Sequence, residues 1–309
     1  MEMSYKKALA KGTEKMVEEK TMNRLKTQFK AYLPLIKYRQ TGLLLFTGFT
    51  GYISARCPVL PLGAFVGFIG SLFLAISGST VLNMVFDRDI DATMNRTSDR
   101  PLPAGKISVN QALFLGLALS SCGLVWSFLL SFLYGAIVFA GLFTDVVVYT
   151  IWLKRKTAWS IVWGGISGGM PILAGRVLGL GHLDIIGGFL SLAVLLWIPT
   201  HIVSFSMKYH DDYRRAGIPT FPSTYGYRNS RLIIAFSSLG AAFAIALGIF
   251  ALGLSWGYLR LLAVLTVGML GLALLGIFRP SEKINSGLFK YASFYMLISM
   301  LMVVLGVLG

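Results

Sequence analysis

Charged side chains are scarce in this sequence. Of its 309 residues, 13% are Asp, Glu, Lys or Arg, whereas a typical soluble domain has about 25%. Hydrophobic residues make up 55% of the chain, and the mean hydropathy is +0.71. This composition excludes an ordinary soluble enzyme. Acid is the scarcer charge, with 13 acidic against 28 basic residues, so the formal net charge is +15.

Cysteine and histidine are scarce as well, with two and three residues. Cys57 and Cys122 lie in apolar surroundings and fit no CxxC or metal spacing, which excludes a disulfide scaffold and a structural zinc site. A nucleic-acid-binding protein would carry its basic residues on one solvated face, whereas a membrane protein would carry them between its spans, on one side. The placement of the basic residues therefore separates these two classes.

Apolar runs are what the sequence has in abundance. They are about 20 residues long, the length that carries a helix across the hydrocarbon core of a membrane. An odd number of such runs places the two termini on opposite sides. The runs predict nine transmembrane helices, near residues 40–56, 61–86, 107–129, 133–153, 157–178, 184–207, 231–253, 257–278 and 287–308.

The basic residues lie almost entirely on one side of these spans. Of the 28, 25 precede the first span or lie in alternate segments after it, and the other three are Arg56, Arg176 and Arg260. Cytoplasmic loops carry the excess of Lys and Arg. We therefore predict an integral membrane protein with a cytoplasmic N-terminus, the C-terminus on the opposite side, and no nucleic-acid partner. A prokaryotic cell membrane is its expected location.

The predicted fold class is all-α, a polytopic membrane protein with nine transmembrane helices around a central cavity and cytoplasmic cap loops at residues 87–106 and 208–231. Residues 33–309 form this nine-helix domain. Residues 1–32 are predicted to be a basic cytoplasmic arm on the anionic membrane surface. A mobile, solvated tail is the alternative for this arm.

Two acidic clusters mark the cap loops. Asn83, Asp87 and Asp91 are spaced i, i+4, i+8, which keeps them within about 80° on one helix face, while Asp89 points away. Such a row suits Mg²⁺, which binds a few carboxylates together with phosphate oxygens. A polar helix end with Asp–Arg pairs is the alternative, but polar groups inside a span are usually functional.

The second cluster is Asp211 and Asp212, and Lys208 shares a helix face with Asp212. Set opposite the first cluster, these acids would complete a cage for a metal and a diphosphate. Arg96 and Arg100 follow the first cluster and fit either a diphosphate or lipid headgroups, because guanidinium groups bind phosphate oxygens in pairs.

The motifs resemble a known family. Asn83-x3-Asp87-x3-Asp91, followed by Arg96-Thr-x-x-Arg100-Pro-Leu, resembles the first signature of UbiA-type intramembrane prenyltransferases. Within that superfamily, the strings at residues 149–155, 164–171, 197–201 and 211–219 resemble the protohaem IX farnesyltransferases, or haem O synthases. Two departures are Tyr38, where the family usually has Pro, and Lys208-x3-Asp212, where other branches have Asp-x3-Asp.

The resemblance implies an Mg²⁺-dependent enzyme that transfers a farnesyl group from farnesyl diphosphate to a vinyl group of haem B, giving haem O. Its implied partners are these two substrates, membrane lipids, and a haem A synthase or oxidase assembly protein. The implied catalytic and metal-binding residues are Asn83, Asp87, Asp91, Asp211 and Asp212. The implied substrate-binding residues are Arg39, Arg88, Arg96, Arg100, Tyr149, Lys154, His201, Lys208 and His210.

Other readings stay open at this level. The acceptor could be a quinone precursor or another tetrapyrrole, and a cation-coupled transporter would also carry acids in its spans, although these acids lie at span ends on one side. His201 fits either a contact with haem or a hydrogen-bonded core histidine. Asp145, inside the fourth span, lies outside the family pattern, and we expect it to bond Tyr149 or a neighbouring helix.

Overall fold

The computed structural model describes residues 32–56 and 61–309. Residues 1–31 of the predicted basic arm, and Cys57, lie outside these ranges. Within them the chain is helical and has no strand. The short helices are η1 (Leu33–Ile36), α4 (Arg88–Thr93) and α9 (His210–Arg215). The long helices are α2 (Tyr38–Ser54), α3 (Leu62–Phe86), α5 (Val109–Leu130), α6 (Phe132–Phe143) continued by η2 (Thr144–Leu153), α7 (Ser160–Leu180), α8 (Ile185–Lys208), α10 (Phe221–Ala251), α11 (Trp256–Phe278) and α12 (Glu282–Leu308).

These long helices confirm the predicted all-α membrane fold. Eight of them, in the described part of the chain, are long and apolar enough to cross a membrane, and the ninth, α2, has 17 residues. Their outward faces expose large apolar side chains that water would disfavour and lipid would accept. Examples are Phe114, Leu129, Phe236, Phe250 and Val267.

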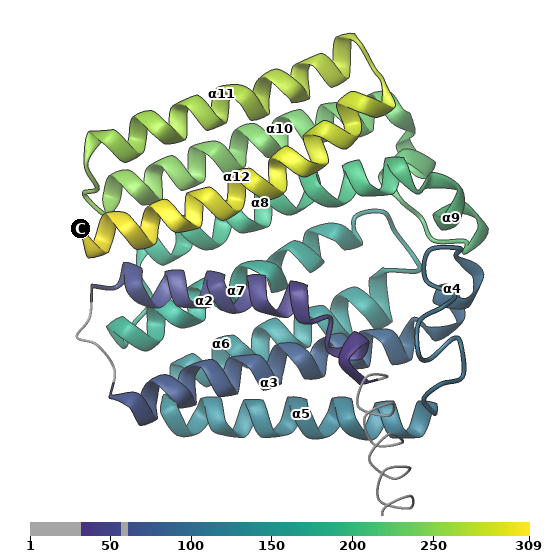
Figure 1. The fold of residues 1–309 in the computed structure, drawn as a ribbon, viewed down its shortest axis with the longest axis horizontal. Helices are drawn as coiled ribbons and strands as arrows, with labels where there is room; N and C mark the ends of the chain where they lie inside the picture. The colour runs from purple at the N-terminus through teal and green to yellow at the C-terminus, as the bar shows by residue number, and fades with distance from the viewer. Residues whose placement is uncertain (1–31, 57–60) are drawn as a thin grey trace, which may run out of the picture.

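The helices form two groups (Figure 1). One group contains α2, α3, α5, α6 and α7, and the other contains α8, α10, α11 and α12. Contacts of α7 with α8 and of α2 with α12 join them. Both α4 and α9 lie at one end of the bundle, here called the site end, and α12 finishes at the opposite end (Figure 1). The two predicted cap loops therefore share one end of the molecule.

Glycines let α2 and α7 touch backbone to backbone. A Cβ added to Gly175 would lie 1.9 Å from the carbonyl oxygen of Gly48, and one added to Gly51 would lie 1.9 Å from that of Ile172. Small residues at such crossings allow membrane helices to approach closely. This crossing fixes the second half of α2 against α7.

One boundary differs clearly from the prediction. Helix α10 begins at Phe221, ten residues before the predicted span, because Thr220 and Ser223 form a reciprocal capping box and Pro222 lies in the first turn. Gly226, with φ 78°, interrupts the helical geometry between this polar start and the apolar span. Hydrophobicity located the span, but the polar helix before it depends on capping.

Candidate active site

The first acidic motif forms a buried row at the site end. The backbone N–H of Asp87 donates to the carbonyl of Asn83 (2.9 Å), and that of Asp91 donates to the carbonyl of Asp87 (2.8 Å). The helical pattern thus continues although Asp87 ends α3. Asn83, Asp87 and Asp91 are 8, 6 and 5% exposed, whereas Asp89 is exposed. The three side chains share a face, as their spacing predicts.

Each carboxylate of this motif is paired with a cation. Lys154, directly after η2, forms an ion pair with Oδ2 of Asp87, and Nη1 of Arg100 lies 2.7 Å from Oδ2 of Asp91. On the opposite face, Arg155 donates from both Nη atoms to Asp89 at 2.7 Å. This fork lowers the pKa of the Asp89 carboxyl. The motif is thereby tied to the end of η2.

The other oxygen of Asp87, Oδ1, is buried and has no hydrogen-bond partner. Buried polar atoms are nearly always paired, so an orphaned carboxylate oxygen needs an explanation. A hard cation fits it, because Mg²⁺ prefers carboxylate oxygens. Within the described ranges, no three His, Cys, Asp or Glu side chains converge on one metal position. The described side chains alone therefore do not complete a metal site. Asp87 and the Asn83 oxygen fit a Mg²⁺ whose remaining ligands would be substrate phosphates.

Lys37, which the sequence analysis did not assign, belongs to the same site. It precedes α2 in a left-handed conformation (φ 45°) and is half-buried. Burial, assisted by the nearby charges of Arg100 and Lys154, lowers its pKa from 10.5 to about 8. Among the residues described, no carboxylate lies within ion-pair distance of its ammonium group. Lys37, Arg100 and Lys154 form what we call the cationic cluster.

The second motif has different surroundings. Asp212 is 7% exposed, forms an ion pair with Arg215, and accepts from the backbone N–H groups of Asn95 (3.3 Å) and Arg96 (3.4 Å). Burial raises the pKa of Asp212, but these donors outweigh it and lower the pKa. Asp212 therefore holds the segment after α4 against α9. Asp211 is exposed and makes no hydrogen bond or ion pair to any described residue.

Arg96 and Lys208 lie over aromatic rings near the contact between α9 and the segment after α4. The Arg96 guanidinium lies 4.9 Å from the ring centroid of Phe205 and 5.5 Å from that of Tyr209. The Lys208 ammonium lies 5.2 Å from the Tyr209 ring. The predicted helix face shared by Lys208 and Asp212 is not formed as one helix, because α8 ends at Lys208 and Asp212 lies in α9, where it pairs with Arg215.

The two site histidines have different surroundings. His201 is sandwiched between Trp197 (4.9 Å) and Phe289 (4.4 Å), and its Nδ1 lies 3.1 Å from the Ser293 hydroxyl. This favours the reading of a hydrogen-bonded core histidine. His210 has a buried Nδ1 with no hydrogen-bond partner.

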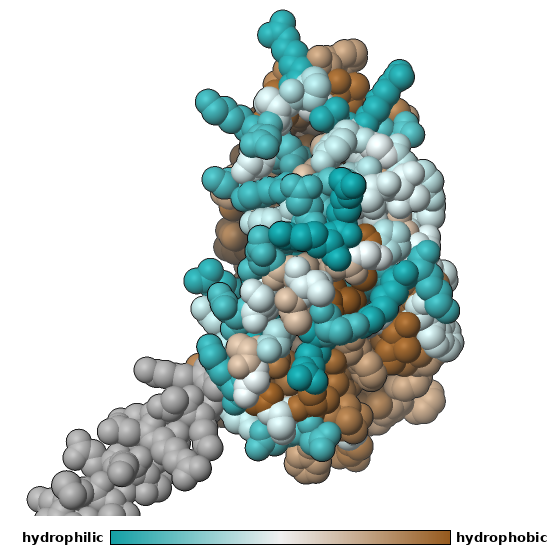
Figure 2. All heavy atoms as spheres, turned by 90° about the vertical axis from the view of Figure 1, so that its right-hand side faces the viewer, coloured by the Kyte–Doolittle hydropathy of each residue, from teal (hydrophilic) through white to brown (hydrophobic). Residues whose placement is uncertain are grey.

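Four more residues that the sequence singles out have different surroundings. The Tyr149 ring lies 5.6 Å from the Lys154 ammonium, so it belongs to the site. Arg39 and Arg88 are exposed, and the structure does not draw them into the cationic cluster. Asp145 bonds Ser79 and Asn83 of α3 rather than Tyr149. Figure 2 looks at the site end and shows hydrophilic side chains over much of this face.

Comparison with known proteins gives independent information on the family. Residues 44–302 match the UbiA prenyltransferase family. The chain is 45% identical over 214 residues to a protoheme IX farnesyltransferase of Archaeoglobus fulgidus, covering 68% of this chain and 74% of the relative. It is 40% identical over 260 residues to a protein of that name from Pyrobaculum islandicum, covering 84% and 92%.

Solved structures show the same fold. A digeranylgeranylglyceryl phosphate synthase superposes with a TM-score of 0.77 at 22% identity, covering 91% of this chain and 99% of that one. A UbiA homolog from Archaeoglobus fulgidus bound to GPP and Mg²⁺ has a TM-score of 0.62 at 15% identity, covering 88% and 99%.

The helical membrane bundle, the carboxylates and cations gathered at one of its ends, and these relatives together place the chain in the class of intramembrane transferases. Within that class, the chain belongs to the UbiA prenyltransferase family.

Proposed function

We propose that this protein transfers a farnesyl group from farnesyl diphosphate to a vinyl group of haem B, giving haem O, with Mg²⁺ as the metal. The unpartnered Oδ1 of Asp87, next to the cationic cluster, is the observation that carries the proposal. The name shared by relatives that are 40–45% identical supports haem B as the acceptor and farnesyl as the donor.

The reaction breaks the bond between C1 of the farnesyl chain and the diphosphate oxygen, and diphosphate leaves with the electron pair. The allylic cation adds to the terminal carbon of the vinyl group. Water then binds the adjacent carbon and loses a proton, which leaves the hydroxyl group of haem O. Bound Mg²⁺ would supply positive charge at the leaving diphosphate.

The cationic cluster stabilises the same leaving group. Negative charge grows on the diphosphate as the bond breaks, so cations fixed beside it stabilise the transition state more than the bound substrate. Lys154 and Arg100 are held in place by Asp87 and Asp91 until the substrate arrives. These two cations would donate to phosphate oxygens of the bound substrate, and Asp87 and Asp91 would then offer their oxygens to Mg²⁺. The Tyr149 ring offers a π face near the allylic cation.

Product analysis tests the proposal. Purified protein is given haem B, Mg²⁺ and farnesyl diphosphate, and the haem fraction is analysed by mass spectrometry. We expect the mass of haem O, and geranyl and geranylgeranyl diphosphates offered in parallel define the chain length. Prenylation of a quinone precursor, with no haem product, would establish another acceptor in the same family. Diphosphate retained intact under all conditions would overturn the transferase function.

We further propose that the site end faces the cytoplasm of a prokaryotic cell and that haem O passes from it to a membrane partner that uses or assembles haem. The support is the 25 of 28 basic residues assigned to one side. In a variant without native cysteines, an impermeant maleimide should label His182→Cys in intact cells and Lys106→Cys only in lysed cells. The reverse pattern would invert the orientation.

A further inference from the structure

Asp145 is an ionisable residue inside a membrane span that the proposed reaction does not use. It lies in η2, a π-helix that continues α6, and no described cation forms an ion pair with it. Intramembrane carboxylates are costly and usually functional. Segments of π-helix also occur often at functional sites. Both features indicate that Asp145 has a function.

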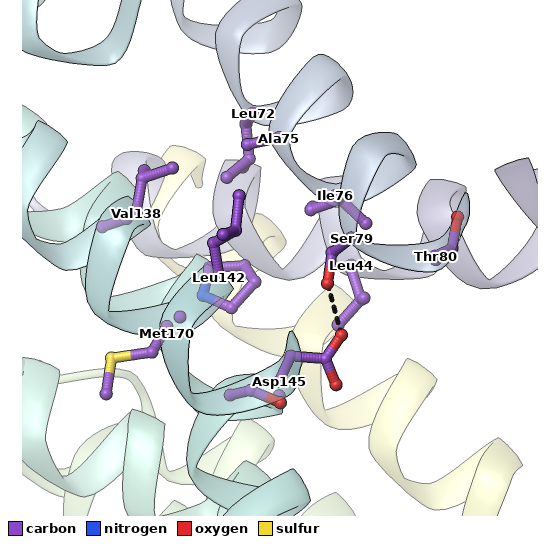
Figure 3. Close-up of a pocket in the computed structure, with 15 residues that line it drawn as sticks. Leu44, Leu72, Ala75, Ile76, Ser79, Thr80, Val138, Leu142, Asp145 and Met170 are labelled. Carbon is purple, nitrogen blue, oxygen red and sulfur yellow. Dashed lines mark hydrogen bonds between the residues drawn. The ribbon is translucent and has the colours of Figure 1, made fainter. Parts of the chain in front are cut away.

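The contacts of Asp145 lead to the first acidic motif. Its Oδ2 accepts from the Ser79 hydroxyl, as Figure 3 shows, and from Nδ2 of Asn83 at 2.8 Å. Oδ1 of the same Asn83 accepts from the Thr150 hydroxyl at 2.9 Å. Asp145 and Thr150 thus bind the two ends of one amide, and that amide is an expected metal ligand.

The π-helix makes this grip possible. Asp145 and Thr150 are five residues apart, and the Thr150 hydroxyl shares its single proton between the Asn83 oxygen and the Asp145 carbonyl oxygen, each 2.9 Å away. In an α-helix residues five apart point about 140° away from each other, whereas the i→i+5 pattern of a π-helix stacks them one turn apart. Both side chains therefore face α3 at the height of Asn83.

A carboxylate partner determines which way the amide points. A carboxylate only accepts hydrogen bonds, so the amide nitrogen must face Asp145, whereas the Thr150 hydroxyl can donate or accept. Turning the amide over would place its oxygen against an anionic oxygen. The Asn83 oxygen is thus fixed on the other side, and one of its two lone pairs remains after Thr150 has used one. Only that oxygen can bind Mg²⁺.

We infer that Asp145 is a positioning residue that orients Asn83 so that its amide oxygen, and never its nitrogen, faces the metal–diphosphate complex. The inference rests on the proposed function for the presence of that complex. It also accounts for a carboxylate on the wall of an apolar cavity of about 100 Å³, lined by residues such as Leu72, Val138 and Met170. A partner lacking the carboxylate would hold α3 equally well but would not select the amide orientation.

The test measures Mn²⁺ affinity by electron paramagnetic resonance in the presence of farnesyl thiodiphosphate, a substrate analogue that does not react. In Asp145→Asn, both orientations of the Asn83 amide can be hydrogen-bonded. We expect Mn²⁺ affinity to fall about tenfold, the lower end of the effect of losing an outer partner of a metal ligand. The thermal unfolding midpoint should stay at the wild-type value. Ser79→Ala is the matched control, because it removes a hydrogen bond to the same carboxylate oxygen and leaves the Asn83 contact intact.

A second background separates orientation from packing. In Asn83→Asp the side chain offers an oxygen whichever way it turns, and it faces the Asp145 carboxylate. Adding Asp145→Asn to this variant should therefore leave Mn²⁺ affinity unchanged or raise it, whereas the same substitution in the wild-type protein should lower it. An equal loss in both backgrounds, or no loss in Asp145→Asn alone, would overturn the inference.

Two further results keep the conclusions separate. If Asp145→Asn does not fold, Thr150→Val decides, since it removes the donor to the Asn83 oxygen, and wild-type Mn²⁺ affinity in that variant would contradict an oriented amide. If the wild-type protein binds no Mn²⁺ with farnesyl thiodiphosphate, the proposed function itself is wrong. If it binds Mn²⁺ and makes no haem O, only the acceptor is wrong and the role of Asp145 stands.

Discussion

The two acidic motifs differ in what their buried carboxylates already bind. Asp87 has one oxygen paired with Lys154 and one buried oxygen with no partner. Asp212 is equally buried, but Arg215 and two backbone N–H groups occupy its carboxylate. The first motif therefore has capacity left for a ligand, whereas the second is used to join two segments of the chain. Burial alone does not distinguish a ligand-binding carboxylate from a structural one. The hydrogen-bond and ion-pair partners of each carboxylate oxygen distinguish them.

Replacing Asp87 should have the largest effect. Asp87→Ala removes the unpartnered oxygen and leaves Lys154 without its carboxylate, so we expect turnover to fall about 10³-fold, the upper range for losing one preorganised charge-stabilising group. Asp89→Ala is the control, because Asp89 lies on the exposed face of the same segment. Steady-state haem O formation measures both. Comparable turnover in the two variants would remove Asp87 from the site.

Asp212→Ala should loosen the cap rather than the metal position. Losing hydrogen bonds to a charged group costs about 1.5–3 kcal/mol, so amide exchange at Asn95 and Arg96 should accelerate accordingly. Asp211→Ala, which removes an exposed side chain, should leave exchange there unchanged. Hydrogen exchange followed by mass spectrometry reads both variants. Unchanged exchange in Asp212→Ala, together with lost Mn²⁺ affinity, would identify Asp212 as a metal ligand. The two motifs would then both bind a ligand.

Lys37 should make diphosphate binding depend on pH. Its pKa of about 8 means that the ammonium is charged below pH 8 and neutral above it. Affinity for farnesyl thiodiphosphate should therefore weaken as the pH rises through about 8. Lys37→Arg keeps its charge in this range and should abolish that decline. An identical pH profile in both proteins would exclude Lys37 from the diphosphate site.

The same shift has an opposite consequence for stability. Because the folded pKa lies below the ordinary value of 10.5, the unfolded chain binds more protons between about pH 8 and 10.5, and stability rises with pH there. Below pH 8 the contribution is constant. The charged form of Lys37 thus destabilises the free protein, and a bound anionic substrate would offset that cost.

Arg96→Lys should have the smallest effect. Lysine keeps the charge but lacks the planar group that lies over Phe205 and Tyr209. We expect the free energy of unfolding to fall by about 0.5–1 kcal/mol, measured by thermal unfolding. Arg96→Gln, which removes the charge, should lose at least as much. A loss in Arg96→Lys as large as that in Asp212→Ala would show that the guanidinium, and not the Asp212 carboxylate, holds the cap segment.

Much of the fold could be predicted because its signals are local. Runs of apolar residues located the nine long helices of the described ranges. The polar starts of α10 and α12 were missed, since capping by Thr220 and Ser281 is independent of hydrophobicity. The shared face of Asn83, Asp87 and Asp91 follows from helical periodicity alone. Lys37 was missed because nothing within its own segment marks it. It joins Arg100 and Lys154 only through the folding of three distant parts of the chain.

The sequence by itself determined the membrane class, the long helices of the described ranges and the first acidic row, because each depends on spacing and composition along the chain. The tertiary structure decided which acids are already satisfied. It paired Asp91 with Arg100, tied Asp212 to the loop after α4, and set Asp145 against Asn83. Hydrogen-bond satisfaction depends on atoms brought together from distant segments, and spacing along the chain does not encode it.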